Sequence, residues 1–566
     1  MALLCIAHRW LPETKPCRIS ASHEYVMRSS AVEILPETRT PSRALVLPLC
    51  LLACGIVPRL ILAHETFLNP DEALHYLLSD QPSLAMAYQV SRTTAHPPLL
   101  VLVLHYWRLL GRSELALRTL ALLTGTAFCW IMFLWLRRVT DRSTALVGLF
   151  LFLFVPSLIT LSAEVRQYSL LLFFAASSLY FLERALQEDS PRMMLLSSCA
   201  LCLALLSHYS SLIFALAIGI YALARLLGVR DRGAVLGTWI AGQLSAVALC
   251  AFLILSHVSR LRRLGLPQDI ADTWLRASIF HSGEDHLSSF IFGRTTRLFR
   301  YFFSHGTIGV IALLLFVYAI VLLVRDRSQP EEFRKPTSRQ IAILLALPFL
   351  IALATALAGL YPYGGTRHDS LLIMFAIPGV SMGLVRLKTR WPWLKPAALV
   401  AGLAICNIFL YPPPPYIPRK NQNRKFMRDA IKFVRQSVPS GSVIYVDHPG
   451  GLLLSYYLCG SAVVPFETQP QPFLTSRCGD YEAVTPSRRL WSFDPDTFPG
   501  TVQEMRRRHQ LHPEAQVWMF QSGWIDWHEE LWIAQLRDYG CNDPQQFGSN
   551  IIVCRMMLDA QRSKSN

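Results

Sequence analysis

Charge is scarce in this chain. Only 16% of its 566 residues are charged and 52% are hydrophobic, whereas a soluble protein carries about 25% charged residues. The charges also cluster between long apolar runs, so one large soluble core explains the composition poorly. The sequence therefore predicts a polytopic α-helical membrane protein.

Other patterns are absent as well. No basic stripe with interleaved aromatic residues occurs, so the net charge of +16 does not indicate nucleic acid as a partner; Lys and Arg gathered in cytoplasmic loops explain it instead. No internal repeat is found, which disfavours many transporters. Residues 1–43 lack an apolar stretch with a small-residue cleavage site, so we expect a cytoplasmic tail rather than a signal peptide.

Apolar runs of bilayer-spanning length, about 17 to 25 residues, recur as far as residue 411. They predict about 11 transmembrane helices. The runs lie at 44–63, 115–136, 143–162, 168–184, 193–208, 210–226, 234–257, 307–324, 340–360, 370–386 and 395–411.

The shorter run 97–111 decides the orientation. If it lies in the interface instead of crossing the bilayer, the tail 1–43 shares one side with Arg-rich short loops such as 137–142 and 325–339. Positive residues close to spans mark the cytoplasm. The first loop, 64–114, then faces outward, as does everything after the last span.

The sequence changes character after residue 411, where four prolines follow and apolar runs become short. We therefore divide the chain into a tail at 1–43, a transmembrane domain at 44–411 and a small extracytoplasmic α/β domain at 412–566. The elements expected in this last domain are strands at 442–446, 463–466, 517–520 and 551–555, and helices at 450–458 and 527–539.

Four cysteines lie in this C-terminal domain, namely Cys459, Cys478, Cys541 and Cys554. An extracytoplasmic location would allow them to form two disulfides. Their spacing is compatible with each of the three pairings.

The best candidates for chemistry lie in the first outward loop. Asp71 and Glu72 follow Asn69-Pro70, a pattern that is ordinary at a helix start, because proline and acidic residues are both favoured in the first turn. A third acid, Glu164, lies in a short outward loop between two spans, so the predicted topology brings it to the same face as Asp71. Two carboxylates at one outer cavity are what acid–base chemistry requires.

Other outward residues have types suited to ligands. His96 opens the interfacial segment and is placed to line a cavity, and Arg367 can clamp a phosphate or anchor the chain among lipid headgroups. The long loop 258–306 carries residues of metal-ligating type. They match no closed metal-site spacing, so a divalent metal there is an open alternative and the sequence establishes no cofactor. These residues are His281, Glu284 and His286.

Taken in order, these segments resemble the GT-C superfamily of glycosyltransferases that use polyprenyl-phosphate sugars. The resemblance is to the branch of protein O-mannosyltransferases and lipid A aminoarabinose transferases, including the RgtA/B/C/D-like group, and it covers about 44–411. The segments that carry it are 69–72 (NPDE), 96–99 (HPPL), 110–118 (LGRSELALR), 164–170 (EVRQYSL) and 367–371 (RHDSL).

The resemblance implies a membrane glycosyltransferase that moves a sugar from a polyprenyl-phosphate donor to a lipid, glycan or protein acceptor. Its active site would face outward, and a bacterial inner membrane is the favoured location. Asp71 takes the position of the family's catalytic base and Glu164 that of a second acid, while Glu72 is a helper or simply a helix-start acid. The expected donor-phosphate contacts are Arg166, Tyr168, Arg367 and His368, although the last two stand where the family usually has Arg-Tyr.

Two other functions are compatible with the sequence. One is a transporter or flippase for a polar lipid, and the other is a non-catalytic scaffold that presents the C-terminal domain. The candidate acids lie at the ends of spans rather than in the middle of the membrane, which favours the enzyme over the transporter.

Overall fold

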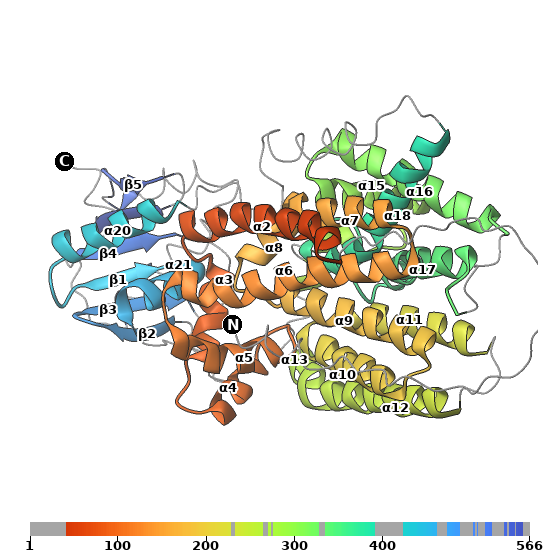
Figure 1. Cartoon of the computed structure of the whole chain (residues 1–566). Coiled ribbons are helices and arrows are strands. Elements are labelled where there is room, and N and C mark those ends of the chain that lie inside the picture. The colour runs from red at the N-terminus through yellow and green to blue at the C-terminus, as the bar shows by residue number, and fades with distance from the viewer. Residues whose placement is uncertain are drawn as a thin grey trace, which may run out of the picture. The chain divides into compact units, whose positions relative to one another are not determined.

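The computed structural model describes residues 41–227, 233–263, 270–272, 275–327, 334–390, 423–460, 473–486, 502–503, 506–507, 516–522, 537–539, 541, 543–548 and 551–557. Helices form nearly all of the described chain up to residue 390. A mixed sheet with its own helices follows after residue 423 (Figure 1).

Long apolar helices form the first part of the chain. Within the described ranges, 7 helices are long and apolar enough to cross a membrane, or 8 if one bent pair counts as a single span. These long helices are α2 (Pro41–Glu65), α6 (Glu114–Val139), α9 (Gln167–Glu188), α12 (Gly233–Leu253), α16 (Gly306–Arg325), α17 (Ser338–Leu357) and α18 (Ile373–Arg390). Helix α12 continues through η3 (Ile254–Val258) into α13 (Ser259–Arg263), and η5 (Arg367–Leu372) leads into α18.

Shorter helices fill the segments between them. Two of these, α10 (Pro191–Ser207) and α11 (Ser211–Leu226), are apolar and have 17 and 16 residues. The remaining ones are α3 (Pro70–Ser79), α4 (Leu84–Ser91), α5 (Leu99–Trp107), η2 (Arg108–Leu110), η4 (Arg276–Ser278) and α15 (Leu287–Phe303).

The predicted spans agree well with these helices. Each span predicted up to residue 386 coincides with an apolar helix or with the bent pair, and the segment 97–111 forms the short helix α5 with η2. The span predicted at 395–411 lies outside the described residues. The predicted class, a polytopic helical protein with a small C-terminal α/β domain, is confirmed.

The bent pair consists of α7 (Arg142–Phe154) and α8 (Pro156–Ala163), which meet at 56°. Pro156 has no N–H and disfavours a helical conformation in the residue before it, so the helix ends there. The carbonyls of Phe152 and Leu153 consequently lose their helical partners. The guanidinium of the fully buried Arg59 in α2 donates to both of them, at 3.1 and 2.5 Å, which explains a cation in an otherwise apolar helix.

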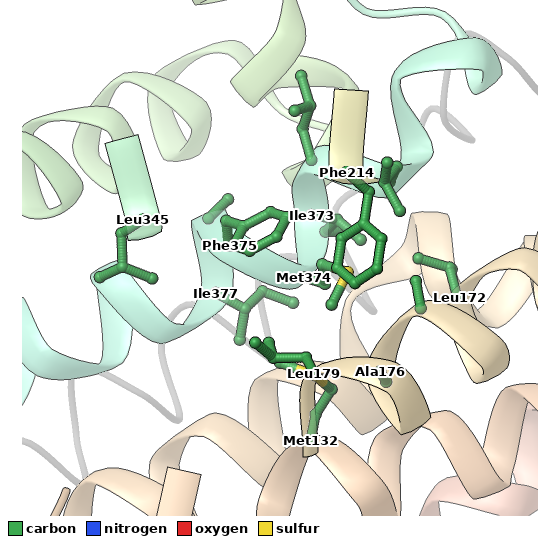
Figure 2. Close-up of a cluster of buried hydrophobic side chains, with 14 of the residues drawn as sticks. Met132, Leu172, Ala176, Leu179, Phe214, Leu345, Ile373, Met374, Phe375 and Ile377 are labelled. Carbon is green, nitrogen blue, oxygen red and sulfur yellow. The ribbon is translucent and has the colours of Figure 1, made fainter. Parts of the chain in front are cut away.

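The helical core lies where α6, α9, α11, α17 and α18 meet. Figure 2 shows side chains of these helices converging, and all of them are buried. Since lipid is as apolar as these side chains, close packing rather than exclusion of water holds such helices together. The labelled residues are Met132, Leu172, Ala176, Leu179, Phe214, Leu345, Ile373, Met374, Phe375 and Ile377.

The described residues of the C-terminal domain form a six-stranded sheet with the strand order β2-β3-β1-β4-β6-β5. β1 is parallel to both of its neighbours, β3 and β4, and the other pairs are antiparallel. The strands are β1 (Val443–Val446), β2 (Phe473–Cys478), β3 (Tyr481–Pro486), β4 (Gln516–Gln521), β5 (Gln545–Phe547) and β6 (Ile551–Met557). Helix α20 (Arg424–Ser437) packs on β5 and β6, and α21 (His448–Leu454), continued by η6 (Ser455–Cys459), packs on β3.

The strands predicted at 442–446, 517–520 and 551–555 and the helix predicted at 450–458 are confirmed. The strand predicted at 463–466 and nearly all of the helix predicted at 527–539 lie outside the described residues. The sequence analysis missed α20 and the hairpin of β2 and β3. Met427, Ala430, Ile431 and Val434 are buried along one face of α20, and their helical spacing is the signal that would have found it.

The structure selects one of the three cysteine pairings. Cys459 is bonded to Cys478, and Cys541 to Cys554. The first bond ties η6 to the end of β2, and the second ties the segment before β5 to β6.

We expect both bonds in the purified protein. Mass spectrometry of an unreduced digest should give peptides linked 459–478 and 541–554. Replacing Cys459 and Cys478 together by serine should lower the free energy of unfolding by about 2–4 kcal/mol, because the denatured chain regains the closed loop's freedom. A linked peptide that joins Cys478 to Cys541 would contradict this pairing.

Candidate active site

The first loop ends in a fully formed helix start. The Asn69 side chain accepts a hydrogen bond from the Glu72 backbone N–H at 3.0 Å, and the Glu72 carboxylate accepts one from the Asn69 N–H at 2.9 Å. Pro70 occupies the first turn of α3. This reciprocal capping box explains the Asn-Pro-Asp-Glu sequence locally and places Asp71 at a defined position in the first turn.

Glu72 is buried, with 1% of its surface exposed. The guanidinium of Arg118 in α6 donates to both of its oxygens, at 2.8 and 2.7 Å, and the Val165 N–H donates at 2.8 Å. Both carboxylate oxygens are thus engaged, and the contacts favour the helix-start interpretation of Glu72 over the catalytic one. Arg118 also donates to the backbone carbonyls of Ala63, Thr66 and Phe67.

Asp71 faces the other way, toward two arginines from distant segments. Its Oδ2 lies 2.6 Å from Arg166, just before α9, and 2.5 Å from Arg367 in η5. Burial by itself raises the pKa of Asp71, but the two guanidiniums outweigh it and hold that pKa well below its usual value. The carboxylate is therefore ionised at neutral pH.

Glu164 lies between α8 and α9, in the same short loop as Arg166. Burial and then the neighbouring charge of Glu72 raise the pKa of Glu164 to about 7, although Arg367 and Arg166 oppose this. In the described part of the chain, its side chain takes part in no hydrogen bond or ion pair. The structure therefore brings the Asp71 and Glu164 segments together, as predicted. The pKa of Asp71 is lowered by its two arginines, whereas the pKa of Glu164 is raised.

Four histidines lie near Asp71 and its two arginines. They are His75 in α3, His96 just before α5, His208 between α10 and α11, and His368 in η5. The ring centroid of His96 lies 6.0 Å from that of His75, 5.4 Å from that of His208 and 6.3 Å from that of His368. Burial lowers the pKa of His75 to about 4 and that of His208 to about 3, so both rings are neutral at neutral pH. The sequence analysis missed His75 and His208, although each lies in or beside a predicted outward loop.

Two further residues at the start of α9 belong to this region. The Arg166 guanidinium lies 5.7 Å from the centroid of the Tyr168 ring. Gln167 is completely buried, and neither its side-chain oxygen nor its nitrogen has a hydrogen-bond partner among the described residues. A buried amide without partners marks a place for water or a polar ligand, and the sequence analysis had assigned Gln167 no role.

The alternative of a metal site on the long loop gains no support. In the described ranges no three His, Cys, Asp or Glu side chains gather closely enough to hold an ion. Glu284 pairs with Arg276 at 2.6 Å instead, and the His281 N–H donates to Asp285. His286 is the N-cap residue of α15, so the contacts of these residues give the metal alternative no support.

Comparison with known proteins gives a family match over part of the chain and a shared fold. Residues 95–257 match the model of the dolichyl-phosphate-mannose-protein mannosyltransferase family; this range contains His96, Glu164, Arg166 and Tyr168. The fold is shared with ArnT from Cupriavidus metallidurans, solved with undecaprenyl phosphate, at 13% identity and a TM-score of 0.50 over 90% of this chain and 97% of that one.

Other solved structures match over shorter stretches. The archaeal oligosaccharyltransferase AglB from Archaeoglobus fulgidus is 12% identical, with a TM-score of 0.43 over 73% of this chain, which spans 63% of the AglB length. The protein O-mannosyltransferase complex Pmt1-Pmt2 of S. cerevisiae is 17% identical, with a TM-score of 0.31 over 39% of this chain and 34% of that one. No curated protein sequence matches the chain.

The buried pair of Glu72 and Arg118 gives a stability prediction. Arg118→Met leaves the Glu72 charge uncompensated in the interior, so we expect a loss of about 3–5 kcal/mol, and the additional change Glu72→Gln should restore part of it. The matched control is Arg138→Met, whose partner Glu188 is partly exposed, with an expected loss of about 0–1 kcal/mol. Unfolding of the detergent-purified chain measures both, and equal losses in the two single variants would disprove the structural role of the buried pair.

Proposed function

We propose that this protein is a membrane glycosyltransferase that moves a sugar from a polyprenyl-phosphate donor to a lipid, glycan or protein acceptor. The observation that carries the proposal is the Asp71 carboxylate held between Arg166 and Arg367, beside neutral imidazoles. The match of residues 95–257 to the protein mannosyltransferase family supports sugar transfer, and the lipid phosphate bound by ArnT supports this class of donor.

The two arginines are suited to the donor phosphate. Phosphate gains charge as its bond to the sugar breaks, and guanidinium groups stabilise that charge through paired hydrogen bonds. Arg166 and Arg367 both contact the Asp71 carboxylate in this structure. A phosphate that shares them reduces the positive charge around Asp71, raises its pKa and makes it a better base. Tyr168, His368 and His96 complete the proposed donor site.

We assign Asp71 the role of general base. It removes the proton from the acceptor hydroxyl while that oxygen bonds to the anomeric carbon of the sugar, and the carbon–oxygen bond to the phosphate breaks. The lipid phosphate leaves with the bonding electrons. Glu164, when ionised, stabilises the positive charge that develops on the sugar ring, and Glu72 holds the loop in place.

The site and the C-terminal domain are assigned to the outer face, and the protein to a bacterial inner membrane. Two disulfides in the C-terminal domain support an oxidising compartment. The short Arg-rich loops gathered on the opposite side of the predicted topology support the same orientation.

Asp71→Asn tests the proposal directly. The variant should lower the rate of sugar transfer from a polyprenyl-phosphate donor about 10²–10⁴-fold, the usual contribution of a general base. Asp429→Asn is the control, since Asp429 is paired with Lys425 in α20, away from the site. Unreduced transfer by a folded Asp71→Asn protein would refute the catalytic assignment and favour a scaffold.

The pH dependence tests Glu164 separately. With a pKa of about 7, Glu164 gains its charge as the pH rises through neutrality, so wild-type transfer should increase between about pH 6 and pH 8. Glu164→Gln carries no charge at any pH, so its rate should be lower and this increase should disappear. An unchanged pH profile in the variant would remove Glu164 from the mechanism.

A further inference from the structure

A second site lies beside the C-terminal domain. A cavity of about 780 Å³ is formed by the later turns of α3, the start of α6, and the helices α20 and η6. The proposed donor site does not line it, because Asp71, Arg166 and Arg367 are not among its residues.

The lining of this cavity is strongly cationic. It includes two carboxylates, Asp80 and Glu114, against five basic side chains. The basic side chains are Arg112, Arg424, Arg428, Lys432 and Arg435.

Both carboxylates are already neutralised. Asp80 pairs with Arg108 at 2.8 Å, and Glu114 pairs with Arg424. Within the described chain, by contrast, the exposed Arg428, Lys432 and Arg435 form no ion pair. The cavity therefore presents uncompensated positive charge.

The helical spacing of residues in α20 gathers the basic side chains on one face. Its apolar residues, such as Met427 and Val434, are buried against the sheet, while Arg428 and Lys432, four residues apart, project together on its exposed face. A solvated basic face would be the ordinary interpretation of such spacing. Here that face forms one wall of a cavity instead.

The opposite side of the cavity carries tyrosines. The rings of Tyr76 and Tyr456 lie 5.1 Å apart in an edge-to-face arrangement. Aromatic rings with hydroxyl groups pack well on sugars, because each offers an apolar face and a polar tip. Tyr76 is itself buried, so the half-buried Tyr456 and Tyr457 are the rings that a sugar could contact beside the cationic side chains.

We propose that this cavity binds a saccharide bearing phosphate groups, as the charged part of the acceptor. That the ligand is an acceptor rests on the proposed transferase function. The binding itself does not. Phosphate oxygens would accept charge-assisted hydrogen bonds from Arg428, Lys432 and Arg435.

The cavity is linked to the proposed catalytic loop. Helix α3 carries Asp71 in its first turn and Tyr76 and Asp80 in the cavity wall, so the two sites are about 8–14 Å apart along the helix axis. The hydroxyl of Tyr457, another lining residue, accepts a hydrogen bond from the Leu68 N–H at 2.8 Å and donates to Glu114. An acceptor held in the cavity by its charged groups would need to span about this distance to bring a hydroxyl to Asp71.

Binding to the detergent-purified full chain tests this inference. Calorimetry with glucose 1,6-bisphosphate should show saturable binding, and the triple variant Arg428→Gln, Lys432→Gln, Arg435→Gln should weaken it at least about tenfold, since charged hydrogen bonds are lost. Lys425→Gln is the matched control, because this exposed residue of α20 pairs with Asp429 and does not line the cavity. Its affinity should equal that of the wild type.

Two further probes define the ligand. Trehalose, an uncharged disaccharide, should not bind measurably, and the triple variant should bind nanodiscs containing phosphatidylglycerol as the wild type does. The proposal is overturned if the triple variant binds the bisphosphate normally, if trehalose binds equally well, or if only the lipid nanodiscs respond to the three substitutions. The assay requires no turnover, so its failure and a failure of the transferase proposal are separate results.

Discussion

The buried ion pair between Glu72 and Arg118 is the constraint on which the site depends. It joins the start of α3 to α6, and through the Val165 N–H it also holds the loop before α9. A buried charge that loses its partner costs several kcal/mol, so these three segments keep one arrangement. That arrangement is what places Asp71 against Arg166 and Arg367.

The three acids of this site have different surroundings, on which their separate proposed roles rest. Both carboxylate oxygens of Glu72 accept hydrogen bonds from the backbone and from Arg118. Asp71, by contrast, is held ionised by two guanidiniums. Glu164, which is without an ion pair in the described chain, has a pKa raised to about 7. Carboxyl groups pushed apart in pKa within one site are a common basis for assigning acid–base roles.

The C-terminal domain packs directly against the loop that carries Asp71. Tyr457 bonds the backbone of Leu68 and the carboxylate of Glu114, and Phe67 and Tyr76 share a buried cluster with residues of α20 and β1. The domain can therefore contribute both to the shape of the loop and, through α20, to recognition of an acceptor. The cationic cavity lies at this junction.

The order of apolar runs predicted the spans, because a bilayer demands a minimum length of apolar helix. The sequence also predicted a helix start at Asn69-Pro70 and the candidate Asp71, because helix capping depends on local residues. The sequence could not show that Arg59 serves the carbonyls freed by Pro156, nor that Glu72 and Arg118 pair, because partners far apart in the chain meet only in the folded helices. By itself the sequence determined the apolar runs, the family resemblance and the candidate acids. Only the tertiary structure decided which acid holds the loop and which faces the arginines, because the direction and partners of buried charges depend on packing.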